Sequence, residues 1–177
     1  MTDFHDLAVN RRSIRRYKSQ PLNPEDVRLI LEAALLAPTG KNSRPWHFTA
    51  VDNPDTLAKL AQCKSAGAGP VAGCPLAIVV CADTTKSETW IEDASIAAAY
   101  MQLQAADLGL GSCWIQVRGR FTADDIPSEE YVRELLGIPE EIQPLCIVTF
   151  GYKDEQRKPQ AVDKLLWDRV SIAGAGE

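Results

Sequence analysis

The stretch LAIVVCA at residues 76–82 is the most strongly apolar part of the chain and is rich in branched side chains. Such a run predicts a central β-strand that is covered on both faces. Before and after it, further segments predict strands at residues 47–51, 112–117 and 145–151. Helical periodicity predicts helices at residues 2–10, 24–36, 54–63, 88–108 and 128–136, and the Gly-rich residues 66–73 predict a mobile loop.

The helix predicted at residues 88–108 is apolar around most of its circumference, and its centre, ASIAAAY, is nearly all small residues. A helix of this kind must be buried on more than one side. Two arrangements fit the pattern: a central helix within a monomer, or a helix that packs on its own sheet and also on a partner subunit. One face carries Trp90, Ala94, Ala97, Met101, Ala105 and Leu108, while Ile91, Ala98 and Leu103 lie elsewhere.

The composition indicates one globular domain and excludes several classes of protein. The chain has 177 residues, of which 45% are apolar and 24% charged, as is ordinary for a chain that buries a core. A net charge of −5 argues against a general nucleic-acid binder and against binding to an anionic membrane surface. The N-terminus has no apolar signal core, and no run approaches the length of a membrane span.

The cysteines and histidines predict no metal site. Five cysteines without a Cys-x-x-Cys pattern, together with two histidines, are poor material for zinc. Cys81 and Cys146 lie inside apolar runs, where a small buried side chain is the expected role. The set fits a reducing compartment, so we expect a cytoplasmic protein.

The segment NRRSIRRY at residues 10–17 places four arginines within six positions of an acidic chain. Guanidinium groups suit phosphate because their donors form a planar fork that matches two oxygens. Ser13 adds a hydroxyl, and the backbone amides of a turn add further donors. The alternative is a solvated charged turn, or arginines that pair with carboxylates elsewhere.

Two further segments carry unusual patterns. In APTGKNSRPWHF, residues 37–48, Pro38, Gly40 and Pro45 restrict the loop, and Asn42 offers both a donor and an acceptor to a ring edge or a sugar. Trp46 is expected to anchor this loop in the core. In GLGSCWIQ, residues 109–116, two glycines separate a helix from a strand, and alone they indicate only a helix end and a tight turn.

Taken in order, these segments resemble the nitroreductase family of FMN-dependent oxidoreductases. The resemblance continues through LAIVVCAD, DASIAAAYM, GLGSCWI, LLGIPEE and FGYKDE, and it covers the chain from about Asp6 to about Arg157. It implies an α+β fold with a mixed, mainly antiparallel central sheet flanked by helices, in an intertwined homodimer. Residues 1–160 would form the FMN-binding domain, and residues 161–177 a C-terminal tail that wraps the partner subunit.

The resemblance also implies a set of cofactor-binding residues and no catalytic side chain, because the flavin carries the chemistry. The arginine turn would grip the FMN phosphate and part of the ring edge, the loop at 38–42 would reach the flavin of the other subunit, and the backbone after GLG would face the ring. Arg157 would complete the phosphate site, with Lys153 a weaker candidate. The full set is Arg11, Arg12, Ser13, Arg15, Pro38, Thr39, Gly40, Asn42, Ile115, Gln116, Val117 and Arg157.

The implied activity is transfer of hydride from NADH or NADPH through FMN to a nitroaromatic, quinone or similar small acceptor, with ping-pong turnover. Alternatives on the same scaffold are ene reduction, dehalogenation and flavin fragmentation, and a different class is a flavin carrier or redox sensor. The chain departs from the family in its short Gly-rich loop at residues 65–73 and at Gln116, Val117 and Arg118, where smaller residues are frequent. Arg118 either enters the pocket or is solvated.

Overall fold

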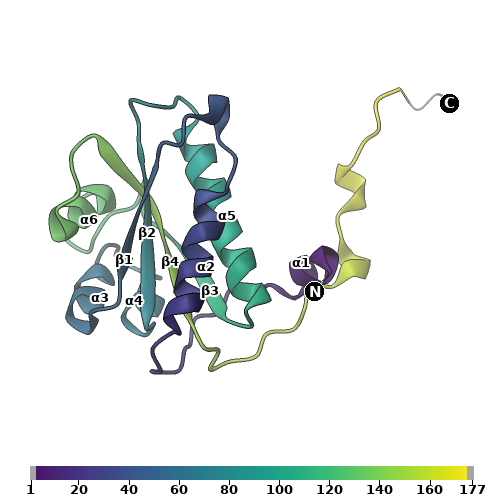
Figure 1. Ribbon diagram of the computed structural model, residues 1–177, viewed down its shortest axis with the longest axis horizontal. Coiled ribbons are helices and arrows are strands. Elements are labelled where there is room, and N and C mark those ends of the chain that lie inside the picture. Colours follow the sequence, from purple (N-terminus) through teal and green to yellow (C-terminus); the bar gives the residue numbers. More distant parts are fainter. Residues whose placement is uncertain (1–2, 175–177) are drawn as a thin grey trace.

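The computed structural model describes residues 3–174 as three layers, with one sheet between two layers of helices (Figure 1). The helices are α1 (Phe4–Asn10), α2 (Pro24–Leu35), α3 (Pro54–Leu60), α4 (Gly69–Ala72), α5 (Trp90–Asp107) and α6 (Ser128–Leu136). The strands are β1 (Trp46–Val51), β2 (Leu76–Asp83), β3 (Gly111–Gln116) and β4 (Ile142–Gly151). Short 3₁₀ turns lie at Gly40–Asn42, Val162–Lys164 and Trp167–Arg169.

The sheet has the strand order β1-β2-β4-β3, and neighbouring strands run antiparallel. Every residue of β2 is buried, which confirms the central strand expected from LAIVVCA. A single parallel bridge from Ser13 to Ser112 adds the N-terminal segment beside β3. The predicted α+β fold with a mixed, mainly antiparallel sheet is therefore confirmed, and β3 lies at one edge of the sheet.

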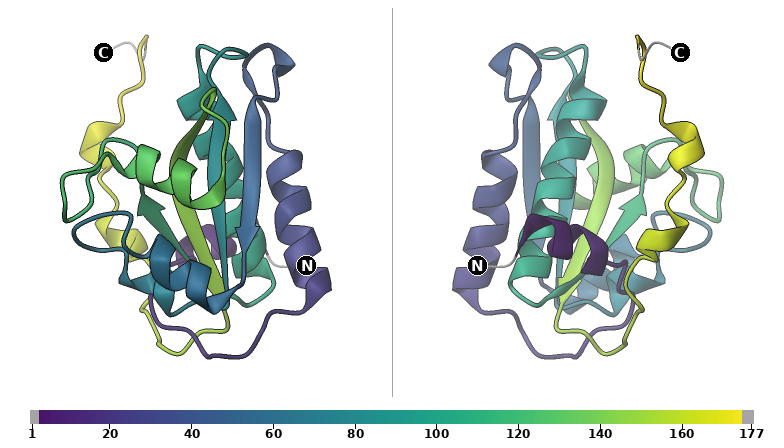
Figure 2. Two further views of the ribbon diagram at one scale, coloured as in Figure 1. Left: turned by 90° about the vertical axis from the view of Figure 1, so that its left-hand side faces the viewer. Right: turned by 90° about the vertical axis from the view of Figure 1, so that its right-hand side faces the viewer.

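Alternate residues of the strands fill two separate cores. On one face, α2 and α5 cover Ile78, Val80, Val148 and Phe150. On the other face, α3, α4 and α6 lie over Val79 and Ile147. The two side views show these layers, with α6 and α3 in front of the sheet in one and α2 and α5 in the other (Figure 2).

The expected mobile loop at residues 66–73 is wrong in part, because residues 69–72 form the helical turn α4. Val71 is fully buried and Ala68 is 2% exposed in the core beneath α3, so apolar burial fixes the segment despite its glycines. The helix expected at residues 54–63 ends at Leu60, and the last strand begins at Ile142, earlier than expected.

Helix α5 has one face buried in its own chain and a second face left open. Ala98, expected to lie away from the main apolar face, is fully buried together with Ala94, Ala97 and Met101. The open face carries Ile96 and Tyr100, which are 37% and 40% exposed. The short helix α1 packs against the C-terminal part of α5 and lines a groove with it (Figure 2).

Residues 156–174 are exposed and lead away from the three layers (Figure 1). Trp167 is 70% exposed, and Leu165 and Leu166 are 49% and 56% exposed. Single exposed apolar side chains are normal, but several close together are typical of a surface that binds another protein. Within residues 3–174, no helix combines the length and apolarity needed to cross a membrane, and no group of His, Cys, Asp or Glu is placed to hold a metal ion.

Candidate functional site

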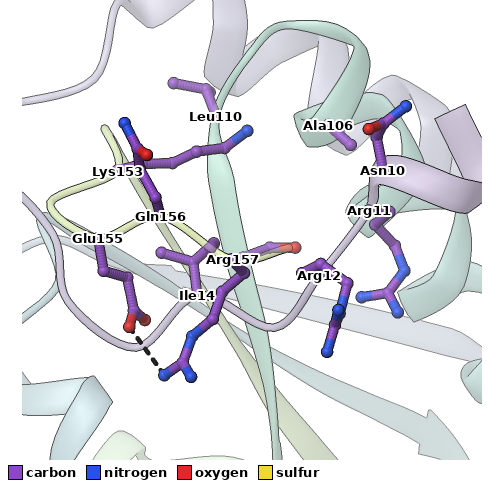
Figure 3. Close-up of a pocket in the computed structure, with 11 residues that line it drawn as sticks. Asn10, Arg11, Arg12, Ile14, Ala106, Leu110, Lys153, Glu155, Gln156 and Arg157 are labelled. Carbon is purple, nitrogen blue, oxygen red and sulfur yellow. Dashed lines mark ion pairs between the residues drawn. The ribbon is translucent and has the colours of Figure 1, made fainter. Parts of the chain in front are cut away.

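A pocket of about 290 Å³ opens between the arginine turn, the start of β3 and the segment after β4 (Figure 3). Its basic residues come from two segments of the chain, with Arg11 and Arg12 from the turn and Lys153 and Arg157 from beyond β4. The complete lining is Asn10, Arg11, Arg12, Ile14, Ala106, Leu110, Ser112, Lys153, Glu155, Gln156 and Arg157. The pocket therefore concentrates positive charge in an acidic protein.

Backbone hydrogen bonds fix the arginine turn against the sheet. The N–H of Ile14 donates to the carbonyl of Ser112 at 2.9 Å, and the N–H of Lys18 donates to the carbonyl of Tyr152 at 2.9 Å. The turn passes so close to β3 that a Cβ on Gly111 would lie 2.8 Å from the side chain of Ile14. Gly111 is thus required for close approach, and it is the first residue of β3 and not the end of α5, which ends at Asp107.

Glu155 is the carboxylate of the pocket, and it positions Arg157. Its side chain is 7% exposed, and Oε2 lies 2.8 Å from Nη2 of Arg157 (Figure 3). Its Oε1 accepts a 2.6 Å hydrogen bond from the backbone N–H of Arg15. The backbone donor of Arg15 and the charge of Arg157 lower the pKa of Glu155. An ionised Glu155 therefore holds the guanidinium of Arg157 at the pocket wall.

The other residues expected in the arginine turn divide between two places. The guanidinium of Arg12 lines the pocket but donates to the carbonyl of Lys158, so it also fixes the start of the tail. Ser13 and Arg15 do not line the pocket. They lie beside Cys113, where burial raises the pKa of the thiol and the charge of Arg15, followed by a hydrogen bond with Ser13, partly offsets that rise.

The edge of β3 that faces away from β4 carries outward-pointing backbone groups along the strand beyond the pocket. The carbonyl of Ser112 points to this edge, because it accepts from Ile14 and not from β4. Main-chain groups alternate between the two edges of a strand, so Gln116 also points its N–H outward. Val117 points the other way and donates to the carbonyl of Leu145 at 3.2 Å. The side chain of Ile115 is buried in the core under α3 and α6.

The end of β3 carries a small aromatic and polar cluster. The side-chain amide of Gln116 accepts from Trp114 Nε1 at 2.9 Å and donates to the carbonyl of Arg118 at 2.8 Å. The guanidinium carbon of Arg118 lies 5.8 Å from the ring centre of Trp90, the first residue of α5. Arg118 is thus exposed and does not line the arginine pocket, and its guanidinium covers an aromatic face.

The loop at residues 38–44 lies at the opposite end of α5 from the arginine pocket. The backbone N–H of Gly40 donates to Oδ1 of Asp93 at 2.8 Å, in the first turn of α5. Ala106, near the other end of α5, lines the pocket. Thirteen residues of helix separate Asp93 from Ala106, or about 20 Å. Within one chain, therefore, the Thr39, Gly40 and Asn42 loop does not meet Arg11, and Trp46 anchors it against Phe48 in the core below α2 and α5.

Sequence reasoning missed several residues of the site. Asn10 and Ser112 line the pocket, and Glu155 orients Arg157. Asp93, which is 2% exposed, was also missed, because in the sequence it stands beside Glu92 as one of two acidic residues in a first helical turn and nothing marks it as the buried one. Glu155 carried no signal either, since a polar residue after a last strand is most often solvated.

All five cysteines are free and buried, which confirms the expected burial of Cys81 and Cys146 and extends it to Cys63, Cys74 and Cys113. Burial raises the pKa of the Cys63 thiol to about 11 and that of the Cys74 and Cys81 thiols to about 12. Thiols with such pKa values are almost wholly protonated near neutral pH and are poor nucleophiles. No thiol is placed to act in the arginine pocket.

Comparison with known proteins agrees with this geometry. The Nitroreductase family model matches residues 8–70 and 64–152. A protein from Archaeoglobus fulgidus, provisionally named an NADH dehydrogenase/NAD(P)H nitroreductase, is 39% identical over 96% of this chain and 97% of its own length. The solved structure of an FMN-dependent nitroreductase from Clostridium difficile superposes with a TM-score of 0.92 at 46% identity, covering 94% of this chain and 97% of that one.

A shorter match is to a protein that is named for a different reaction. Iodotyrosine deiodinase 1 of Rattus norvegicus is 37% identical over 60 residues, which cover 34% of this chain and 21% of the deiodinase. The family match covers the arginine turn and all of β3, and ends just before Lys153. The two long relatives cover nearly the whole chain. The chain belongs to the nitroreductase family and is an oxidoreductase.

Proposed function

We propose that the chain binds FMN with its phosphate in the arginine pocket and its ring beside the end of β3. The observation that carries this proposal is the shared edge: Arg11 and Arg157 lie at the start of β3, and the Gln116 N–H points outward from the same edge. Ser112 and Gln116 are four residues apart, or roughly 14 Å along the strand. An elongated ligand with one anionic end fits this arrangement.

The donor set of the pocket suits a phosphate ester. Arg11 and Lys153 supply positive charge, Arg157 is oriented by Glu155, and Ser112 adds a polar residue to the lining. Arg11, Lys153 and Arg157 carry three positive charges and Glu155 carries one negative charge. The two net positive charges offset the two negative charges of a phosphate. Ser13, Arg15 and Arg12 act through the turn itself, by holding it against β3 and the start of the tail.

We propose that a second copy of the chain completes the site. The loop carrying Pro38, Thr39, Gly40 and Asn42 is about 20 Å from the pocket along α5, too far to reach it within one chain. If two copies of α5 pack antiparallel about a twofold axis, the loop of one chain comes to the pocket end of the other. The exposed Ile96 and Tyr100 face supports such packing. The tail at residues 161–177, which the structure describes as far as residue 174, would then wrap the partner of the domain at residues 1–160.

The chemistry supplied by bound FMN would be acceptance of hydride from NADH or NADPH and delivery of two electrons to a nitroaromatic, quinone or similar acceptor in a second half-reaction. The chain's own part is to bind the phosphate, to direct the Gln116 N–H at the ring, and to exclude water from the interface. No side-chain acid or nucleophile is required. The buried thiols are in keeping with a reducing, cytoplasmic setting.

The first test is the absorbance of the purified protein, which should show a flavin that acid releases. Replacing Arg11 with Ala should weaken FMN binding about 10- to 100-fold, the effect of losing a hydrogen bond to a charged group. Arg28→Ala is the matched control, because Arg28 is paired with Glu25 and Glu32 on the exposed face of α2. Unchanged FMN affinity in Arg11→Ala would reject the phosphate assignment.

Two other functions remain open to direct test. Reductive dehalogenation is favoured by the similarity to iodotyrosine deiodinase 1, and iodide release from an iodinated phenol by the reduced protein would reveal it. A carrier or redox sensor would be reduced by NADH or NADPH but would not turn over. Rapid reoxidation by a nitroaromatic or a quinone distinguishes the proposed enzyme from both.

A further inference from the structure

The loop at residues 40–44 is held in a conformation that its own residues disfavour. Lys41, Asn42 and Arg44 all have positive φ, at 53°, 54° and 47°. Left-handed backbone is unfavourable for residues with a Cβ, although Asn tolerates it better than Lys or Arg. Three such residues within four positions persist only when the surroundings determine them, and such strain gathers at functional sites.

The bonds inside the loop are not enough to explain its conformation. Thr39 Oγ1 accepts from the N–H of Arg44 at 3.1 Å, and Asn42 Oδ1 accepts from Arg44 Nε at 3.1 Å. Two backbone bonds, from Asn42 to the carbonyl of Thr39 at 3.1 Å and from Ser43 to the carbonyl of Gly40 at 3.0 Å, are also internal to the loop. All four bonds join groups of the loop to each other and would move together with it. Something outside the loop must fix it to the body of the protein.

Asp93 provides that attachment. Its side chain is 2% exposed and accepts hydrogen bonds with both oxygens. Oδ1 accepts from the N–H of Gly40 at 2.8 Å, and Oδ2 accepts from Ser87 Oγ at 2.7 Å and from Thr89 Oγ1 at 3.3 Å. A buried carboxylate is stable when donors surround it in this way, and the N-terminus of α5 favours its charge.

The approach of the loop to this carboxylate leaves no room for a side chain. A Cβ on Gly40 would lie 2.5 Å from Thr89 Oγ1. Gly40 therefore brings its N–H to Asp93 at a distance that no other residue could reach without displacement. The exposed ion pair between Lys41 and Glu88, at 3.0 Å, adds a second and weaker link between the same segments.

We propose that Asp93 is a positioning residue for the flavin site of the partner subunit. Asp93 does not line the arginine pocket of its own chain, but by fixing the N–H of Gly40 it holds Thr39, Gly40 and Asn42 in the strained shape that meets the other chain's flavin. This inference rests on the proposed function, since it assigns a purpose to a loop that lies about 20 Å from the pocket of its own chain.

The competing explanation is that Asp93 only stabilises the start of α5. Acidic residues in a first helical turn do so by interacting with the helix dipole. That role would make Asp93→Ala less stable but would leave the loop shape and the flavin affinity of the folded protein unchanged. The flexibility of the loop and the affinity for FMN must therefore be measured separately from the stability of the fold.

The first measurement is limited trypsin digestion of the native protein. Trypsin can cut after the exposed Lys41, whereas Pro45 blocks cleavage after Arg44. Asp93→Ala should release the loop and speed cleavage after Lys41 at least about 10-fold, because local opening becomes easier. Asp93→Asn keeps an oxygen for the Gly40 N–H and should behave like the wild type. Met101→Ala, a cavity variant in the same helix with no contact to the loop, controls for a general loss of stability.

The second measurement is FMN affinity at a temperature where all variants are folded. Asp93→Ala should bind FMN about 10- to 100-fold more weakly, while Asp93→Asn and Met101→Ala should stay within about 3-fold of the wild type. Faster cleavage after Lys41 with unchanged FMN affinity would overturn the proposal, and so would weakened binding in Met101→Ala to the same degree.

Mixed dimers show in which chain Asp93 acts. When Asp93→Ala and Arg11→Ala chains are combined, a loop that serves the partner leaves one site with both changes and one site with neither, so tight FMN binding returns. A loop that serves its own chain leaves every site damaged, and tight binding does not return. If dimers made only of Arg11→Ala chains bind FMN as tightly as the wild type, the proposed function fails. If those dimers bind FMN weakly while dimers made only of Asp93→Ala chains bind it normally, the proposed function stands and the role of Asp93 is refuted.

Discussion

Replacing Trp167 with Ala should weaken dimerisation far more than it changes the stability of one folded chain. The side chain is 70% exposed on a tail that leads away from the three layers, so in a monomer it contributes little. In the proposed dimer the same side chain is covered by the partner. The change therefore removes contact area that exists only between chains.

The size of the effect follows from the area concerned. A Trp side chain has roughly 250 Å² to bury, so Trp167 leaves roughly 175 Å² uncovered at 70% exposure. At about 25 cal/mol per Å², full coverage contributes about 4 kcal/mol in each of two symmetric positions. Ordering of the tail and incomplete coverage offset about half of this sum. About 4 kcal/mol per dimer remains, or an increase of about 1000-fold in the dissociation constant.

Analytical ultracentrifugation over a dilution series measures this constant directly. Tyr131→Ala serves as the control, because it removes an aromatic side chain from the α3 and α6 layer, where Tyr131 donates to the carbonyl of Lys59 at 2.8 Å. Its dimer constant should stay within about 3-fold of the wild type, since distant sites act independently. An unchanged constant in Trp167→Ala would show that the tail does not bind the partner.

Three further predictions concern the interface, the pocket and the thiols. Tyr100→Glu, on the open face of α5, should give a folded monomer with poor FMN binding by ultracentrifugation and flavin titration, whereas Ala98→Glu should fail to fold because Ala98 is fully buried. The pKa of Glu155 is lowered in the folded chain, so its charge stabilises the fold above the ordinary Glu pKa, and that contribution is lost as the pH falls through the lowered value. Glu155→Gln should therefore lower the melting temperature at pH 7 by roughly 3 °C and flatten its acid dependence, and an unaltered pH profile would refute the argument. Burial raises the pKa of every cysteine thiol. Iodoacetamide at pH 8 should therefore label the native chain slowly and the unfolded chain quickly, as counted by mass spectrometry. Rapid labelling of the native protein would contradict this prediction.

Most of the layered fold could be predicted, because it follows from runs and periods of apolar residues. The run at residues 76–82 has one interpretation as a strand, and every residue in it is buried. Short segments were harder, because residues 66–73 carry the glycines of a loop and yet α4 forms there. One buried side chain, Val71, outweighs the local preference, and its burial depends on α3 packing above it.

The site was less predictable, since its parts depend on contacts between distant segments. The arginine turn was visible as an unusual charge cluster, but Arg157 was found only through the family resemblance. The positive φ at Lys41 and Arg44 had no sequence signal, because these residue types rarely adopt it. Their conformation is set by Asp93, some fifty positions away, and by the close approach of Gly40.

The edge strand β3 has a consequence for how the protein behaves among other chains. A row of unpaired backbone groups invites strands of neighbouring molecules to add on, which is the first step of many aggregates. Here the segment at Ser13 pairs with Ser112, and the backbone of Val117 turns back to Leu145. Only residues 113–116 stay open, which is shorter than the five to six residues of a typical strand. The open edge of β3 is thus long enough to lie along a small ligand but shorter than the strand that another molecule would need for pairing. The chain without its ligand is therefore not expected to aggregate through this edge.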